Sequence, residues 1–108
     1  MTRSKFPYIR SRAHLMAVAS LDCQLCGKGG PSQAAHSNQA IHGKGRSIKA
    51  SDEYTAALCQ RCHAEIDSGH CLTSEERTRI WDLAYQRTCA ALGKTLMAKP
   101  RDDETIAP

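Results

Sequence analysis

Two pairs of cysteines constrain this chain more than any other feature of its sequence. Cys23 and Cys26 form the first CxxC pair, Cys59 and Cys62 form the second, and 32 residues lie between the pairs. A two-residue spacer lets both sulfurs of a pair reach one ion, and four thiolates suit the tetrahedral geometry of zinc. We therefore predict one shared structural zinc that ties two distant stretches of the chain together.

The short length of the chain makes such a metal site useful. A chain of 108 residues with one Trp, one Phe and three Tyr buries only a limited core. A disulfide-linked secreted module is the competing interpretation of the cysteines. However, the N-terminal stretch lacks the apolar segment of a secretion signal, and no stretch is long and apolar enough to span a bilayer. We therefore expect a cytoplasmic chain whose reduced thiols bind metal.

Other assignments of the cysteines stay open. His63, His70 or Cys71 could replace one of the four thiolates as a zinc ligand, although Cys71 lies outside both pairs. Cys89 is most simply a small buried residue in the last predicted helix. A thiol redox protein built on one CxxC pair is a further interpretation, but it does not explain the second pair or the histidine that follows it.

Positive charge is concentrated in the first half of the chain. Residues 1–51 carry eight basic side chains against one acidic side chain, a net charge of +7. Residues 52–108 carry seven basic and ten acidic side chains, a net charge of −3. A basic half favours a polyanionic partner, most simply DNA, although a solvated surface is the ordinary alternative.

A basic loop lies between the two CxxC pairs. Its cations Lys44, Arg46 and Lys49 could contact phosphates without reading the base sequence. Gly43 and Gly45 permit a close approach of the backbone to a sugar–phosphate chain. An ordinary surface loop would have a similar composition.

The sequence predicts a small zinc-stapled α+β domain at residues 10–97. A flexible basic arm at residues 1–9 precedes it and a disordered tail at residues 98–108 follows it. Ser11 is the expected cap of the first helix, and Thr73 and Glu76 form a capping box for the last helix. The expected elements are helices at 11–20, 60–67 and 73–92, strands at 33–36 and 54–58, and a loop at 37–51.

Two histidines are not needed for the zinc. His63 and Asp67 are four residues apart on a predicted helix, so they project from one face and could hold a divalent ion. His36 ends a predicted strand, where a lone histidine is more often structural than catalytic. Its place between the two CxxC pairs favours a functional role.

Residues 10–70 resemble the HNH endonucleases, also called His-Me finger or ββα-metal endonucleases. The resemblance rests on the order CxxC, Ala-His, a basic glycine-containing loop, an acidic residue and then CxxCH. It is greatest to the small phage and prophage group that includes the YbcO-type nucleases and the RecA-dependent nuclease Ref. It implies a ββα-metal core with flanking helices and metal-dependent hydrolysis of DNA in a bacterial host cell, with a recombination protein such as RecA as a candidate partner.

The resemblance also implies a role for His36. This residue matches the general base that takes a proton from the water attacking a phosphodiester, a task suited to neutral imidazole. Asp52, seven positions before Cys59, would orient His36 or supply a metal ligand. A non-catalytic zinc module that binds DNA or a recombination partner is the alternative, and it does not require His36 to be a base.

The same resemblance implies a second metal site for a catalytic Mg²⁺, Mn²⁺ or Zn²⁺. His63 matches the metal ligand on the motif helix, and Asp67 stands where a further ligand is often found. Ala35 stands where the family often has Asp or His, so one ligand is missing. His42 is a candidate for that missing ligand.

Overall fold

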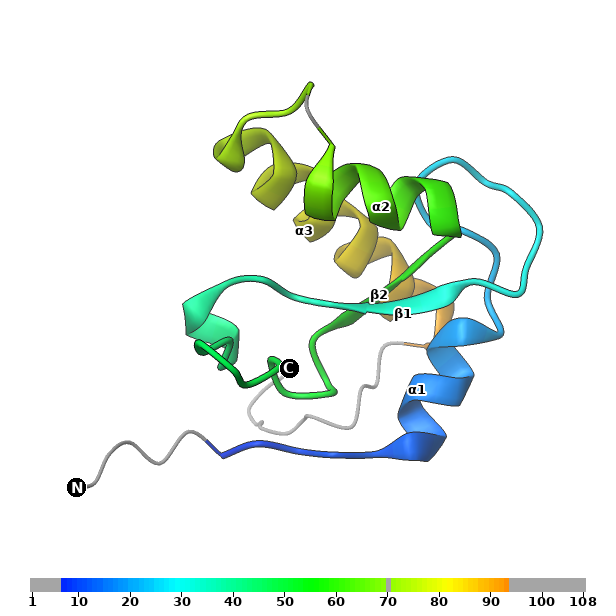
Figure 1. Ribbon diagram of the computed structural model, residues 1–108. Coiled ribbons are helices and arrows are strands. Elements are labelled where there is room, and N and C mark those ends of the chain that lie inside the picture. Colours follow the sequence, from blue (N-terminus) through cyan, green and yellow to red (C-terminus); the bar gives the residue numbers. More distant parts are fainter. Residues whose placement is uncertain (1–6, 70, 94–108) are drawn as a thin grey trace.

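The computed structural model of this chain describes residues 7–69 and 71–93. It confirms an α+β fold of three α-helices and a two-stranded sheet, as Figure 1 shows. The elements follow in the order α1 Arg12–Ala19, β1 Gln33–His36, the 3-10 helix η1 Ala40–His42, β2 Thr55–Leu58, α2 Gln60–Ser68 and α3 Ser74–Ala91.

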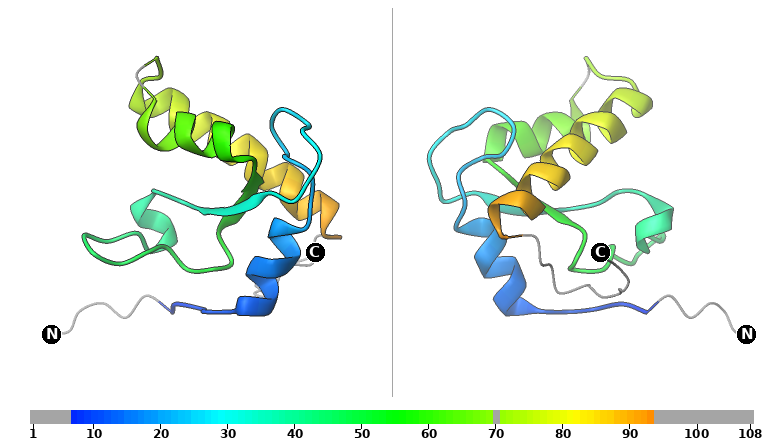
Figure 2. Two further views of the ribbon diagram at one scale, coloured as in Figure 1. Left: turned by 45° about the vertical axis from the view of Figure 1, so that its right-hand side comes forward. Right: turned by 180° about the vertical axis from the view of Figure 1, so that it is seen from behind.

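The two strands are antiparallel and divide the molecule into two sides. His36 lies opposite Thr55, and Gln33 lies opposite Leu58. Figures 1 and 2 show α1 on one side of the strands and α2 on the other, while α3 crosses behind β2. Because side chains alternate between the faces of a strand, neighbouring residues of β1 point to different helices.

The hydrophobic core lies between the strands and helices α2 and α3. Alanines on the strands let the helices approach closely, and the large Trp81 side chain fills the space, with its Nε1 donating to the Ala35 carbonyl at 3.0 Å. Thr88 of α3 accepts a hydrogen bond from the Ala57 backbone N–H at 3.0 Å, which fixes α3 against β2. The buried cluster consists of Cys23, Ala35, Ala56, Leu58, Cys59, Ile66, Trp81 and Ala84.

Local capping explains where the helices begin. The Ser11 side chain accepts from the His14 N–H at the start of α1, and Thr73 and Glu76 form the predicted capping box of α3. The Cys59 sulfur accepts from the Cys62 N–H at the start of α2. The predicted elements are found within one or two residues of their expected ends, except that the expected loop contains η1.

The segment before α1 runs along the segment before β2. The Asp52 N–H donates to the Ile9 carbonyl at 2.8 Å, and the Ile9 N–H donates to the Ser51 hydroxyl at 2.8 Å. Tyr8, in the predicted basic arm, donates its hydroxyl to the Gly43 carbonyl. The predicted tail at 98–108 and the predicted end of the domain at 94–97 lie outside the described residues. None of the helices within the described ranges is long and apolar enough to cross a membrane.

Candidate metal centre and active site

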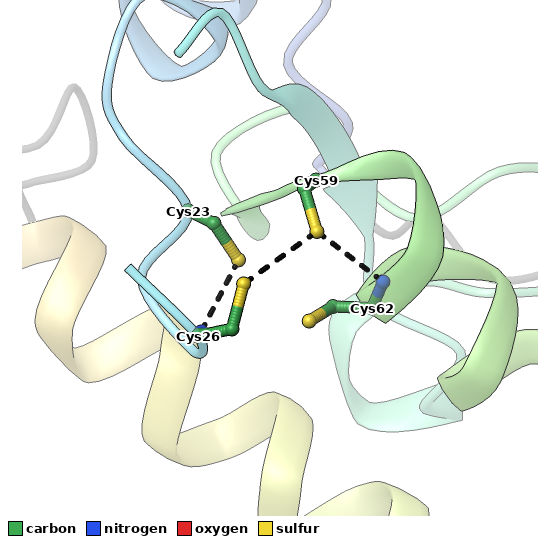
Figure 3. Close-up of side chains that lie close together, drawn as sticks. All are labelled: Cys23, Cys26, Cys59 and Cys62. Carbon is green, nitrogen blue, oxygen red and sulfur yellow. Dashed lines mark hydrogen bonds between the residues drawn. The ribbon is translucent and has the colours of Figure 1, made fainter. Parts of the chain in front are cut away.

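The sulfur atoms of the four cysteines converge on one point, as Figure 3 shows. They lie within 4.8 Å of one another, and the sulfurs of Cys26 and Cys59 are 3.7 Å apart. Zinc–sulfur bonds of about 2.3 Å in a tetrahedron separate the sulfurs by about 3.8 Å, so the spacing fits such an ion. The four cysteines could therefore hold a structural metal ion such as zinc. Cys71 is exposed and does not belong to this group.

The electrostatics of the cluster also favour a cation. Burial alone would raise the pKa of Cys23, but hydrogen bonds from the backbone at Cys26, Cys59 and Leu25 lower it to about 6. The pKa of Cys62 is raised, first by burial and then by the neighbouring thiols. Since thiolates packed together repel one another, a divalent cation is what would allow all four to ionise.

His36 and Asp52 form the first of two histidine–carboxylate pairs. The His36 Nε2 and Asp52 Oδ1 atoms are 2.8 Å apart, and the two side chains are 19% and 6% exposed. Asp52 also accepts from Arg10 Nη1 at 3.2 Å and from the Ser11 N–H at 2.7 Å. Burial would raise the pKa of the Asp52 carboxyl, but the bonds from His36 and Ser11 and the Arg10 charge hold it below its usual value.

The surroundings of Asp52 include residues that the sequence did not single out. Arg10 reaches past Asp52 to the carbonyls of Ala50 and Lys49, at 2.6 and 2.8 Å. Burial lowers the pKa of His14, and the nearby Asp52 charge acts in the opposite direction. The predicted helix cap at Ser11 was the one sequence feature that marked this region, because the helix that starts there brings its first residues to the Asp52 carboxylate.

His63 and Asp67 form the second pair, on the exposed side of α2. The His63 Nε2 and Asp67 Oδ2 atoms are 3.2 Å apart. This separation is that of a hydrogen bond between an imidazole N–H and a carboxylate, and a histidine and a carboxylate so placed could also share a divalent cation. Gln33 lies 2.7 Å from His63 Nδ1, and Asn38 donates to Asp67 Oδ1 at 3.1 Å. β1 and the residues after it thus hold both members of the pair.

His42 does not join this second pair. Its Nδ1 is 2.6 Å from the Ser37 hydroxyl, and its ring stacks on Tyr54 with the centroids 4.2 Å apart. Burial in this aromatic cluster lowers the pKa of His42, although Asp82 raises it. The turn at η1 directs the imidazole inward, so the expected third ligand packs in an aromatic stack instead.

The two histidine–carboxylate pairs lie on opposite faces of β1. Gln33 and His36 are three residues apart in the strand, so their side chains point in opposite directions. Gln33 meets His63 on the α2 side, whereas His36 meets Asp52 beside the start of α1. Among the described residues, the cysteines form the only group of three or more potential ligands within 4.8 Å. The structure therefore does not unite His36, His63 and Asp67 in one ligand cluster.

The position before His36 offers no metal ligand. Ala35 is 1% exposed and packs in the core beside Trp81. A carboxylate there would point toward α2, on the side of His63 and Asp67. The candidate ligands at this place are therefore His63 and Asp67.

The predicted phosphate-contacting cations lie in the segment that Arg10 and Tyr8 hold. Arg46 and Lys49 are exposed, while the Lys44 ammonium donates to the Gly45 carbonyl at 3.0 Å. The bond from Arg10 to the Lys49 carbonyl brings this segment next to Asp52. Positive charge and the His36–Asp52 pair therefore occupy one side of the molecule.

Comparison of this chain with protein-family models, with curated proteins and with solved structures found no match.

Proposed function

We propose that this protein is a metal-dependent DNA endonuclease of the ββα-metal type that carries a structural zinc. The observation that carries the proposal is the His36–Asp52 pair, a partly exposed imidazole held at 2.8 Å by a buried carboxylate. It lies at the end of β1, whose second edge pairs with no other strand of residues 7–69 and 71–93, and Arg10 lies beside it. This combination suits proton abstraction next to a bound phosphate.

The zinc holds the parts of the site in place. Cys59 and Cys62 lie at the junction of β2 and α2, and the zinc joins that junction to the segment after α1. The orientation of α2, and with it His63 and Asp67, is fixed relative to β1 by this link. A site built on elements held in this way keeps its geometry better than one built on free loops.

His36 acts as the general base. A carboxylate only accepts hydrogen bonds, so His36 donates its Nε2–H to Asp52 and keeps the lone pair on Nδ1. Nδ1 takes a proton from the attacking water, and the Asp52 charge stabilises the imidazolium that forms. Asp52 therefore orients His36 and does not itself lose or gain a proton.

His63 and Asp67 would be the two protein ligands of the catalytic cation. Mg²⁺ commonly keeps several waters and binds to one or two carboxylates together with substrate phosphate oxygens, so the Ala35 position does not need to supply a ligand. When bound, the cation supplies charge for the scissile phosphate and the leaving oxygen. Because the two pairs lie on opposite faces of β1, the phosphate must lie across the free edge of that strand.

Cleavage of supercoiled plasmid DNA in Mg²⁺ or Mn²⁺ tests this function. In His36→Gln the amide nitrogen takes the position of Nε2 and can still donate to Asp52, but no basic nitrogen remains, so we expect nicking to fall about 10²- to 10⁴-fold. Arg79→Ala, on the exposed surface of α3, is the control that should cleave normally. Zinc content and thermal unfolding should be unchanged in both variants. Equal nicking by wild type and His36→Gln would reject the base assignment.

A non-catalytic zinc module that binds DNA is the second candidate. The observation that favours it is the role of Asp52 as a structural link, since this carboxylate also binds Arg10 and the Ser11 N–H. Such a module would bind DNA with an affinity that falls steeply with salt, and no divalent cation would elicit cleavage. Salt-dependent binding without nicking by the wild-type protein would decide for this candidate.

A further inference from the structure

A pocket lies where the residues after β1 meet α2 and the first turns of α3. Its volume is about 180 Å³, and Ile66 and Trp81 form its apolar lining. Because one water takes about 30 Å³ in the liquid, the pocket has room for a ligand several times larger than a water molecule. The polar lining residues are Asn38, Gln39, Ser74, Arg77 and Thr78.

Two amide side chains present hydrogen-bond acceptors at this pocket. Asn38 donates its NH₂ group to Asp67 at 3.1 Å, and Gln39 donates its NH₂ group to Asp82 at 2.7 Å. Carboxylates only accept hydrogen bonds, so they fix the orientation of both amides. Each amide oxygen is left as an acceptor, and neither has a hydrogen-bond partner within residues 7–69 and 71–93.

Arg77 presents a donor at the same place. Its Nη1 donates to the Asp67 carbonyl at 3.2 Å, and its Nη2 donates to the Gly69 carbonyl, which fixes the guanidinium plane at the end of α2. The Nε atom is buried and has no partner in the described part of the chain. A buried donor without a partner is costly, and a ligand acceptor in the pocket would satisfy it.

Arg77 is the one charged residue in the pocket lining, and both of its Nη atoms already donate to backbone carbonyls. Asp67 and Asp82, which accept from the two lining amides, add negative charge beside the lining. A neutral ligand with both donors and acceptors on its edge and with apolar faces matches the lining better. Among the constituents of DNA, a nucleobase has this chemistry, whereas a phosphate does not.

The apolar lining is rigid. The Trp81 ring stacks on Tyr85 with the centroids 5.0 Å apart, and its Nε1 is held by the Ala35 carbonyl. Trp81 and Ile66 are 4% and 3% exposed, so they give the pocket a narrow apolar wall against which the edge of a base could pack. A preformed surface of this kind binds without a large loss of conformational entropy.

We propose that this pocket binds an unpaired nucleobase of the DNA substrate. The inference rests on the proposed function, since the hydrogen bond between Asn38 and Asp67 joins the pocket to the proposed binding site of the catalytic cation. A base in the pocket would then belong to a nucleotide next to the scissile phosphate. A base within a duplex has its edge paired and its faces stacked, so the pocket selects DNA with a single-stranded segment.

Abasic scanning of a single-stranded oligonucleotide tests this proposal. The His36→Gln protein is titrated with a fluorescein-labelled ten-nucleotide strand and with strands that carry one abasic site, so that the phosphates are unchanged. At one position, loss of the base should weaken binding about tenfold. Trp81 is the only tryptophan of the chain, so its fluorescence should change with the intact strand and change less with that abasic strand. Equal affinity for the intact strand and every abasic strand would overturn the proposal.

Matched variants assign the effect to the pocket. Thr78→Val removes a hydroxyl at nearly constant shape, and Arg77→Lys removes the Nε donor. Both should weaken binding of the intact strand and leave binding of the abasic strand unchanged. Arg79→Lys, on the same helix and exposed, should alter neither. If Arg77→Lys lowers the melting temperature, the comparison of intact and abasic strands is made with Thr78→Val alone, and unchanged binding of the intact strand by that variant would overturn the proposal.

The binding and cleavage measurements together distinguish a failure of the pocket proposal from a failure of the proposed nuclease function. Cleavage that requires His36, together with equal binding of intact and abasic strands, would reject the pocket and keep the nuclease. An abasic effect in a protein that cleaves neither plasmid DNA nor the single-stranded oligonucleotide in Mg²⁺ or Mn²⁺ would reject the nuclease and keep the base-binding pocket.

Discussion

The cysteine cluster and the two histidine–carboxylate pairs occupy neighbouring parts of the same structure, yet they differ in how completely they are formed. The four sulfurs lie within 4.8 Å of one another, and the sulfurs of Cys23 and Cys59 also accept from backbone N–H groups within their own CxxC pairs. The side chains of the two pairs are also held by Arg10, Ser11, Gln33 and Asn38, and the pairs lie on opposite faces of β1. A structural metal site is closed by its own ligands, whereas a hydrolytic site must leave positions open for substrate and water.

The cysteine cluster should dominate stability. In Cys62→Ser a hydroxyl replaces a thiolate, so we expect loss of bound zinc and a loss of more than about 3 kcal/mol of unfolding free energy, because zinc binding is coupled to folding. Zinc content per chain and thermal unfolding measure both effects. Cys71→Ser, exposed and outside the cluster, should keep its zinc and its melting temperature. A Cys62→Ser protein that retains one zinc and the wild-type melting temperature would remove Cys62 from the ligand set.

The His36–Asp52 pair should make the next largest contribution. Asp52→Asn removes the negative charge and presents an NH₂ group to donors from His36, Arg10 or Ser11, so we expect a loss of about 2 kcal/mol. Unfolding in urea at pH 7 measures it. Asp22→Asn, which changes an exposed carboxylate, should shift stability by less than about 0.5 kcal/mol. Equal stabilities for Asp52→Asn and Asp22→Asn would show that Asp52 is not the link described here.

The contribution of Asp52 should depend on pH with a definite sign. Folding lowers the pKa of Asp52 below its usual 3.8, so its ionised form stabilises the folded state above that value. The stabilisation is lost as pH falls through the lowered pKa of the folded state. The difference in unfolding free energy between wild type and Asp52→Asn should therefore shrink as pH falls below about 4. A constant difference between pH 7 and pH 2 would contradict this.

The His63–Asp67 pair should contribute least to stability and most to the metal requirement. Asp67 is 46% exposed, so Asp67→Asn should cost less than about 1 kcal/mol. If the pair holds the catalytic cation, the Mn²⁺ concentration that gives half-maximal nicking should rise at least about tenfold, as expected for a lost ligand. Glu65→Gln, exposed on the same helix, is the matched control. An unchanged Mn²⁺ requirement in Asp67→Asn would place the cation elsewhere.

The secondary structure of this chain was largely predictable because its signals are local. The capping box of Thr73 and Glu76 and the cap at Ser11 act over three residues. The starts of α3 and α1 can therefore be predicted from the sequence without knowledge of the tertiary structure. The turn η1 was not predicted, since its hydrogen bonds run between neighbouring backbone groups in a polar stretch with no strong pattern.

The histidines show where prediction from the sequence ends. Asp52 meets His36 from 16 residues away and takes its other partners, Arg10 and Ser11, from about 40 residues earlier in the chain, and no local pattern relates these positions. The predicted ligand role of His42 overlooked that Tyr54 and Trp81 would surround this ring. Which face of a strand a side chain occupies depends on register, and one residue of shift reverses it.

The sequence by itself determined the four-cysteine site, the α+β class and the helix caps, because chelation by CxxC and capping depend on spacings of two to four residues. Only the tertiary structure decided that His36 meets Asp52 while His63 meets Asp67 on the other face of β1, and that a pocket adjoins Asp67. These arrangements follow from how two strands pair and how α1, α2 and α3 pack around them. Such long-range packing is set by the whole chain and not by any short segment.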